Sequence, residues 1–362
     1  MKVVHIDTGY EFRGGQRQLL RLARGLRERQ HDQLIVTPDS SELEAHALAE
    51  GFRVFALPAY DWGHANGILQ LRQRLLAEPA DMLHAHDGRG QTISWLASLG
   101  LPVRRVASRR VTFLPEAPAR HRFMYTHTCH AVIAVSEHIR SLLIAAGVPA
   151  ENIEVVPDGI EIPPELPSRD ERARQRHLWN LQDEDFVLGL LGAFTPEKGH
   201  DIGMESIRLL AEKLPSVRLL LVGDGPPEMT VRIREQARAI GDRVQILGPL
   251  EDLAGFFAAL DLFIMPSRAE GLGSAALLAM AHGKAVIASR VGGLPEVVEE
   301  GRTGWLVAPG SPEELAGAIL VAATDRERLR AYGAEGRERA RQFSSDIMVA
   351  RTEEVYFHLL RT

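Results

Sequence analysis

The sequence is poor in the features that define several protein classes. Cys129 is the single cysteine in 362 residues, so a framework of intramolecular disulfides is excluded and a reducing compartment is expected. Basic residues are not in excess, because 42 lysines and arginines stand against 48 aspartates and glutamates, with a net charge of −6. That balance argues against a general nucleic-acid binder, whose domain is usually basic.

Long apolar runs are also missing. None approaches the ~18 residues that a membrane-spanning helix needs. The run at the start of the chain is only a few residues long and is interrupted by His5 and Asp7, so it lacks the pattern of a signal peptide. We therefore expect a cytoplasmic protein, with peripheral attachment to the inner face of a membrane as an open alternative.

What the chain does have is a regular alternation of short apolar runs and helix-like stretches. This spacing predicts an α/β fold with parallel, doubly wound sheets. The strands expected in the first half are Val3–Ile6, Gln33–Val36, Val54–Leu57, Met82–Ala85, Arg104–Ala107, Ala131–Val135 and Ile153–Val156. Those expected in the second half are Phe186–Leu191, Val217–Val222, Val244–Leu247, Leu262–Met265, Ala285–Ser289 and Trp305–Val307.

The alternation is interrupted between Asp158 and Asp185, where proline and charged residues accumulate. This stretch predicts a linker and a short surface helix, so we expect two doubly wound domains with a cleft between them. Ligands of such sheets bind outside the carboxyl ends of the strands. The chain ends in a helical segment from Ser311 to Leu360, which we expect to break near Gly333 and Gly336.

The stretch from Leu262 to Met280 predicts a strand, a glycine-rich turn and a helix. Gly271 and Gly273 form the turn, and Glu270 lies in it. A corner of this kind points free backbone N–H groups at an anion, and a fixed carboxylate could hold sugar hydroxyls. The alternative is an ordinary βα corner without a ligand.

Three further turns of the second half also follow strands. Lys198 lies just past the first strand, in TPEKG, where its ammonium could meet a diphosphate. Gly223 and Asp224 follow the next strand, and Gly292 and Gly293 follow a later one. Each turn alone is weak evidence, but four turns at the carboxyl ends of one sheet together indicate a phosphate-binding site.

In combination these motifs resemble those of the retaining glycosyltransferases of family 4. The second half carries TPEKG, LLLVGDGP, PSRAEGLG, AMAHGKAVIAS and GGLPEVV, and the first half carries a GG turn, HAHD, AVIAVSEHIRSLL and VPDGIE. The resemblance implies the GT-B fold, with two Rossmann-like domains, and sugar transfer from a nucleotide diphosphate sugar without a metal or another cofactor. It also implies an acceptor-binding domain of residues 1–165 plus about 344–362, and a donor-binding domain of residues 170–343.

The resemblance also implies roles for individual residues. Lys198 would bind the donor phosphates, Glu270 would hold the donor sugar, and His86 would line the sugar site. His86 could instead be a histidine at the end of a strand whose imidazole forms hydrogen bonds with the backbone and binds no ligand. The implied donor-binding residues are Gly14, Gly15, Lys198, Gly223, Asp224, Gly271, Leu272, Gly273, Ser274 and Leu278, and the implied catalytic residues are Glu270 and His86.

Three positions depart from the family pattern. Ala193 stands where the family usually has an arginine, and Leu278 stands where it has a second glutamate that anchors the ribose. The stretch Ser108 to Arg110 replaces a T-x-H pattern that ends the acceptor-side pocket. A protein that binds nucleotide sugar or glycan with little turnover is therefore an alternative to an efficient enzyme.

Two clusters of the first half invite other interpretations. His84, His86 and Asp87 have the residue types of metal ligands, but we expect only one of the two imidazoles to face the cleft and favour no metal site. An arginine cluster suits an anionic membrane surface or a phosphorylated acceptor, with a solvated loop as the alternative. Its members are Arg104, Arg105, Arg109, Arg110, Arg120 and Arg122.

The sequence therefore predicts a glycosyltransferase that uses a nucleotide sugar, which we expect to be a UDP-sugar. The expected acceptor is a cell-envelope glycan, as in lipopolysaccharide or polysaccharide biosynthesis, or a lipid-linked saccharide. A nicotinamide-dependent dehydrogenase is a poorer interpretation, because the first βα turn lacks the G-x-G-x-x-G fingerprint.

Overall fold

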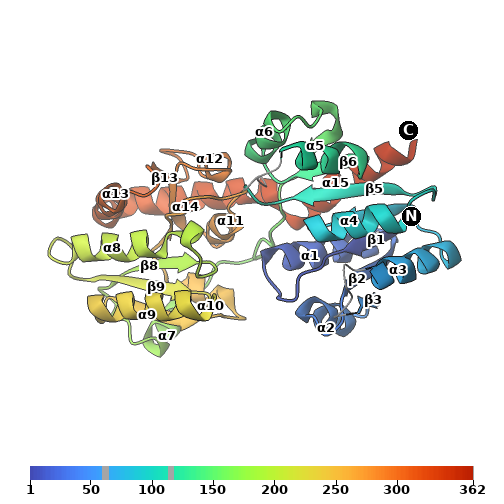
Figure 1. The fold of residues 1–362 in the computed structure, drawn as a ribbon. Coiled ribbons are helices and arrows are strands. Elements are labelled where there is room, and N and C mark those ends of the chain that lie inside the picture. The colour runs from blue at the N-terminus through green and yellow to red at the C-terminus, as the bar shows by residue number, and fades with distance from the viewer. Residues whose placement is uncertain (59–64, 113–117, 362) are drawn as a thin grey trace. The chain divides into compact units, whose positions relative to one another are not determined.

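The chain folds into two compact units, each built around its own parallel sheet (Figure 1). The computed structural model describes residues 1–58, 65–112 and 118–361, and it leaves out the side chains of residues 118 to 121 as well. The first unit comprises Met1–Gly159 and Ser345–Thr362, and the second comprises Ile160–Ser344. The chain therefore enters the second unit at Ile160 and returns to the first at Ser345 for its last helix.

The sheet of the first unit has seven parallel strands in the order β3-β2-β1-β4-β5-β6-β7. The strands are β1 (Lys2–Ile6), β2 (Asp32–Pro38), β3 (Arg53–Leu57), β4 (Met82–Ala85), β5 (Arg104–Arg109), β6 (Ala131–Ala134) and β7 (Ile153–Val155). The helices are α1 (Gly14–Glu28), α2 (Glu42–Ala49), α3 (Ala65–Ala77), α4 (Gly88–Ala97), α5 (Pro118–His127), α6 (Glu137–Ala145) and α15 (Ser345–Arg361).

Helices cover both faces of this sheet, which is why its central strands β1 and β4 are almost entirely buried and mostly apolar. Val3 packs with α1 and α15 on one face, and its neighbour Val4 packs with α3 and α4 on the other. Helix α15 approaches α1 closely at Gly25, because a Cβ there would lie 2.5 Å from a methyl group of Val349. The last helix is thus an integral part of the core of the first unit.

The sheet of the second unit has six parallel strands in the order β10-β9-β8-β11-β12-β13. The strands are β8 (Phe186–Leu191), β9 (Val217–Val222), β10 (Val244–Gly248), β11 (Leu262–Met265), β12 (Ala285–Ser289) and β13 (Gly304–Val307). The helices are α7 (Arg169–Leu178), α8 (His200–Leu210), α9 (Pro227–Ile240), α10 (Leu253–Ala259), α11 (Ser274–Ala281), α12 (Leu294–Val297), α13 (Pro312–Thr324) and α14 (Arg326–Ala340). Among the described residues, no helix combines the length and the apolar character that crossing a bilayer requires.

The fold class predicted from the sequence is confirmed, and each expected strand is present with ends that differ by at most two residues. The expected break near Gly333 and Gly336 is wrong, because both glycines lie inside the continuous helix α14. A Cβ at Gly333 would lie 2.3 Å from the carbonyl oxygen of Gly283, so the glycine permits α14 to pack closely rather than ending it. The segment is divided instead at Asp325 and again at Ser344.

Candidate functional site

Each sheet has a point where the order of its strands reverses. In the first unit the chain moves from β1 outward to β2 and β3, and then places β4 on the other side of β1. In the second unit β9 and β10 lie on one side of β8, and β11 lies on the other. A crevice opens at the carboxyl ends of the strands at such a point, and ligands of α/β sheets bind there. Several of the predicted site residues follow β1, β4, β8 and β11.

Lys198 and Glu270 meet at the reversal point of the second unit. Lys198 ends a short 3-10 helix after β8, and Glu270 follows β11. The Lys198 ammonium lies 2.6 Å from Oε1 of Glu270, and the hydroxyl of Ser267 donates to the same oxygen at 3.0 Å. Glu270 is only 8% exposed, so this carboxylate is held in one place. Within the described part of the chain, its Oε2 is left to accept a hydroxyl of a ligand.

The glycine turns around this pair pack backbone against backbone. A Cβ at Gly292, whose φ is +60°, would lie 1.9 Å from the carbonyl oxygen of Glu270. A Cβ at Gly223, whose φ is +142°, would lie 2.0 Å from the carbonyl oxygen of Gly192. Glycine at these two positions is therefore required by the fold itself, because any other residue would prevent the loops from approaching.

Helix α11 begins immediately after this turn, at Ser274. The first N–H groups of a helix have no acceptor within it, so those of Ser274 and Ala275 face the region in front of the helix. Leu272 is buried, Leu278 is half-buried on the helix, and Asp224 is exposed beyond β9. The second unit thus places the Lys198 ammonium, the Glu270 carboxylate and the N-terminus of α11 at the carboxyl end of its sheet.

The glycine pair of the first unit differs from those in the second. Gly14 and Gly15 are the first two residues of α1, and a Cβ at either one would have no heavy atom of the described residues within 4 Å. Neither has a positive φ. Glycine costs about 1 kcal/mol relative to alanine inside a helix. No described residue of this unit requires glycine at these two positions. A site where a ligand approaches the backbone would require it.

A buried carboxylate fixes the start of α1 relative to the sheet. Asp7 follows β1 and accepts hydrogen bonds from the Gly9 amide at 2.9 Å and from the Gln16 side-chain amide at 2.8 Å. The Gln16 carbonyl oxygen in turn accepts from the backbone N–H of Arg13 at 3.1 Å. Burial, together with the nearby charge of Asp87, raises the pKa of Asp7. Gln16 therefore ties the Gly14–Gly15 turn to the end of β1.

Three buried histidines lie in β1, in β4 and directly after β4. The expectation that only one of the imidazoles of His84 and His86 faces the cleft stays a prediction. The two side chains lie on the same side of the chain, because residues two apart in extended backbone point the same way. Their ring centroids lie 4.1 Å apart, and His5 of β1 joins them. Burial lowers the pKa of His5 to about 4 and lowers those of His84 and His86 well below the usual value.

The predicted arginine cluster does not form one surface. Arg104 and Arg105 begin β5, whereas Arg109 ends that strand and Arg110 follows it. Five residues of extended chain separate these pairs by roughly 16 Å. Arg109 is buried, Arg122 is exposed on α5, and the side chain of Arg120 lies outside the described residues. Only the second pair therefore lies at the carboxyl end of the sheet, where a ligand would bind.

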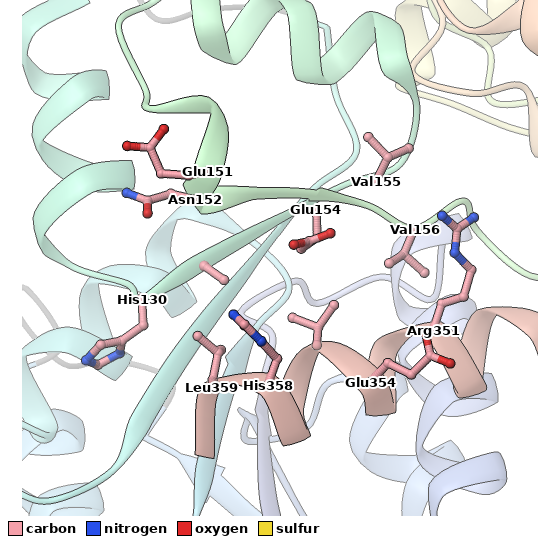
Figure 2. Close-up of a pocket in the computed structure, with 12 residues that line it drawn as sticks. His130, Glu151, Asn152, Glu154, Val155, Val156, Arg351, Glu354, His358 and Leu359 are labelled. Atoms are coloured by element: carbon pink, nitrogen blue, oxygen red, sulfur yellow. The ribbon is translucent and has the colours of Figure 1, made fainter. Parts of the chain in front are cut away.

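Two hollows lie away from these crevices. The first has a volume of about 430 Å³. Figure 2 shows His130, Glu154, Glu354 and His358 lining it, between α15 and the strands β6 and β7. The second, of about 720 Å³, reaches the amino end of β10 at Val244. Neither contains a predicted site residue.

Comparison with known families assigns the chain. Residues 12–162 match the family model described as "Glycosyltransferase Family 4", and residues 185–325 match the model described as "Glycosyl transferases group 1". The chain belongs to the group 1 glycosyltransferases of family 4. It is thus a glycosyltransferase that takes its sugar from a nucleotide sugar, as the sequence predicted.

Two curated relatives are similar to this chain over most of their length. The chain is 29% identical over 348 residues to the GDP-mannose-dependent alpha-(1-6)-phosphatidylinositol monomannoside mannosyltransferase of Mycolicibacterium smegmatis, covering 90% of each chain. It is 28% identical over 320 residues to the N-acetyl-alpha-D-glucosaminyl L-malate synthase of Bacillus anthracis, covering 86% of this chain and 82% of the relative. The donors and acceptors of these relatives differ.

The fold is shared with a solved structure of Anabaena Alr3699/HepE in complex with UDP-glucose. The TM-score is 0.90 at 24% identity, and the match covers 99% of this chain and 100% of the other. At this identity the likeness establishes the GT-B fold.

Sequence reasoning missed two residues of this glycosyltransferase that the structure brings to the crevices. Ser267 shares Oε1 of Glu270 with Lys198, and its position three residues before Glu270 in the same turn was a usable signal. Gln16 positions the glycine turn of the first unit, and only its place two residues after Gly14 hinted at this. The predicted donor-binding and catalytic roles remain predictions.

Proposed function

We propose that this glycosyltransferase moves a sugar, with retention of anomeric configuration, from a UDP-sugar bound by the second unit to an acceptor bound by the first. The observation that carries the proposal is the Lys198–Glu270 pair at the reversal point of the second sheet. It supplies a cation for a diphosphate and a fixed carboxylate for sugar hydroxyls, immediately before a helix N-terminus. The proposed acceptor is a cell-envelope glycan or a lipid-linked saccharide.

Negative charge builds on the diphosphate as the sugar leaves. The Lys198 ammonium and the N–H groups of Ser274 and Ala275 stabilise that charge without rearranging, which lowers the barrier. Glu270 accepts hydroxyls of the donor sugar through Oε2 and so orients the anomeric carbon. The further proposed donor contacts are Gly14, Gly15, Gly223, Asp224, Gly271, Leu272, Gly273 and Leu278.

Retention requires that the acceptor attack from the face that the diphosphate leaves. On that route the departing phosphate oxygen takes the proton of the acceptor hydroxyl. The pair of carboxylates that hydrolases use is then unnecessary. Glu270 accordingly acts by positioning the donor, and no metal ion is required to neutralise the diphosphate.

The proposed nucleotide base of the donor and the proposed acceptor are argued from the relatives. The Anabaena protein is seen with UDP-glucose, which supports a UDP-sugar, whereas the Mycolicibacterium relative uses GDP-mannose and acts on a phosphatidylinositol mannoside. A lipid-linked acceptor would bring the enzyme to a membrane surface. Helix α5 suits that contact, because Arg122 is exposed and Phe123 is 43% exposed on it.

The proposal is tested by thermal shift with UDP, GDP and ADP and with their sugars, in the presence and absence of EDTA. A ligand at 100 times its Kd adds ~2.7 kcal/mol to the free energy of unfolding, so the preferred donor should raise Tm by several degrees. UDP and a UDP-sugar should give the largest shifts, unchanged by EDTA. A larger shift with GDP would mean that the donor carries guanine instead of uracil, and no shift with any nucleotide would refute donor binding.

A second candidate function is binding without efficient turnover. Ala193 supplies no cation beside Lys198, and Leu278 supplies no acceptor for a ribose hydroxyl on α11. If this candidate holds, a UDP-sugar binds and stabilises the protein while sugar release stays near the uncatalysed rate. ¹H NMR of the reaction separates the two by the rate at which product signals appear. It also tests retention, because a retaining enzyme yields product with the anomeric configuration of the donor.

A further inference from the structure

His5, His86 and Arg110 form a hydrogen-bonded series at the carboxyl end of the first sheet. Nη1 of Arg110 lies 3.4 Å from Nδ1 of His86, and Nε2 of His86 lies 3.1 Å from Nδ1 of His5. Nε2 of His5 lies 2.7 Å from Oε1 of Gln33. His5 is fully buried and His86 is 7% exposed, so water does not replace these partners.

The guanidinium sets the direction of the whole series. Arginine can only donate, so Nδ1 of His86 must be the unprotonated acceptor. A neutral His86 then carries its proton on Nε2 and donates it to Nδ1 of His5. His5 in turn carries its proton on Nε2 and donates it to the carbonyl oxygen of Gln33. The reverse direction would bring an N–H of His86 against an N–H of Arg110.

Two neighbouring contacts support this arrangement. Arg110 is anchored from its other side, because its Nε donates to Oδ1 of Asp158 at 2.9 Å. Among the described residues the Gln33 side-chain N–H₂ group is buried without a partner. A buried donor without a partner is unfavourable by ~1–3 kcal/mol. This cost is expected where the Gln33 carbonyl oxygen must accept the hydrogen bond from His5, because the N–H₂ group of the same side chain then points elsewhere.

The same contacts argue against a metal ion on the three histidines. Their nitrogens lie within 4.8 Å of one another, which is within reach of a shared ion. However, both nitrogens of His84 are engaged by hydroxyl groups, with Tyr356 at Nδ1 and Ser108 at Nε2. A cation would also have to displace the His5–His86 hydrogen bond beside the charge of Arg110.

We propose that Arg110 is a positioning residue that holds His86 and His5 neutral, each with its proton on Nε2, and thereby gives the crevice of the first unit a single hydrogen-bonding pattern. Both ring nitrogens of His86 are then committed to protein partners. His86 shapes the crevice and does not act there as a proton acceptor. The assignment of protons stands on these contacts alone, while its importance for the acceptor rests on the proposed function.

Charged groups surround the series on every side. Asp7 follows β1, Asp87 follows β4, Arg109 ends β5, Arg110 follows it, and Asp158 follows β7. Tyr356 of α15 closes the cluster over His84. If Arg110 were lost, the three carboxylates would remain with one cation fewer, and His86 could take a proton at Nδ1 and donate it toward Asp158. The histidines would then titrate.

The test is side-chain ¹⁵N NMR of the full chain labelled at histidine, followed from about pH 5.5 to 8, where free histidine titrates. Signals are assigned with His5→Gln and His86→Gln. We expect both residues to show an unprotonated Nδ1 and a protonated Nε2, with no midpoint in this range. A protonated Nδ1 on either residue, or a midpoint in the range, would overturn the proposal.

Arg110→Met and Arg110→Lys form a matched pair, since the two side chains have similar length and only lysine keeps a cation and a donor. We expect a midpoint for His86 to appear within the range in Arg110→Met and to be absent in Arg110→Lys. Identical spectra for Arg110→Met and the native protein would also overturn the proposal. The readout needs no donor or acceptor, so it is independent of whether the proposed transfer is correct.

Discussion

The Lys198 ammonium and the Glu270 carboxylate lie 2.6 Å apart in the second unit, although the two are proposed to bind different parts of the donor. Each side chain therefore neutralises the other until a ligand arrives. A diphosphate that attracts Lys198 would leave Glu270 with Ser267 as its remaining partner on Oε1. When Lys198 changes its partner from Glu270 to the diphosphate, the Glu270 carboxylate is released to bind the sugar. Phosphate binding and sugar binding are therefore coupled.

Replacing Glu270 should therefore strongly lower the rate of sugar transfer while the fold persists. We expect Glu270→Ala to lower the rate of sugar transfer by ~10²-fold or more, because the acceptor that orients the donor sugar is lost. Glu270→Gln keeps the shape and one carbonyl oxygen, so it should retain more activity than Glu270→Ala. Normal turnover by Glu270→Ala, measured with the donor found in the thermal-shift panel, would show that this carboxylate is part of an ordinary βα corner.

The glycines of the two units should respond differently to alanine. Gly14→Ala adds a methyl group where no described atom lies within 4 Å, so the free energy of unfolding should stay the same or rise by up to ~1 kcal/mol. Donor binding and turnover should nevertheless fall, because the methyl group occupies the space of the ligand. Gly223→Ala is the matched control, since its Cβ would lie 2.0 Å from a carbonyl oxygen and should destabilise the protein.

Denaturant melts and nucleotide calorimetry on both variants separate these effects. A stable Gly14→Ala protein with native donor affinity and turnover would contradict the assignment of Gly14 as a ligand contact.

Leu278 offers a test by gain of function. It is half-buried on α11, so a longer polar side chain has room to reach solvent. We expect Leu278→Glu to tighten nucleotide binding by at most ~1.5–3 kcal/mol, less the cost of desolvating the carboxylate, by accepting ribose hydroxyls. The 2′,3′-dideoxynucleotide should gain nothing in the same titration. Equal gains for both nucleotides, or unfolding of the variant, would show that Leu278 packs and that the ribose is held elsewhere.

The buried histidines should make the first unit sensitive to acid. In the unfolded chain His5 takes up a proton near pH 6.5, whereas in the folded protein burial lowers its pKa to about 4. Between these values the unfolded state binds more protons, so the free energy of unfolding falls as pH falls from about 6.5 toward 4. His84 and His86 act in the same direction. The raised pKa of Asp7 opposes them nearer the acid end.

Each such proton is worth ~1.4 kcal/mol per pH unit within that window. Urea melts at about pH 7.5 and pH 5.5 should therefore show a loss of stability in the native protein. The loss should be smaller in His5→Gln, which removes one of these protons. An identical pH dependence in the two proteins would mean that His5 is not buried in its neutral form.

The sequence was sufficient for the sheets because their strands are apolar on both faces. Val3 and Val4 are buried on opposite sides of β1, and runs of this kind are visible without any tertiary information. Gly333 and Gly336 show where that approach fails. A glycine inside a helical pattern predicts a break, and only the carbonyl of Gly283 packed against it reveals a close contact instead.

The positions of site residues that belong to a sequence motif could be predicted. Contacts between residues far apart in the sequence could not. Lys198 and Glu270 could each be placed after a strand, but the ion pair between them depends on β8 and β11 being neighbours in the sheet. The series through His5, His86 and Arg110 joins three strands in the same way. No spacing in the sequence encodes which nitrogen donates, because the direction follows from the position of one guanidinium.

The central claim, that Lys198 receives the diphosphate of a nucleotide sugar, is tested most directly by titration calorimetry of UDP and uridine into the native protein and Lys198→Ala. A charge-assisted contact is worth ~1.5–3 kcal/mol, so the variant should lose about tenfold to a hundredfold in affinity for UDP. Its affinity for uridine, which has no phosphate, should be nearly unchanged. Equal losses for UDP and uridine, or no loss for either, would contradict the account.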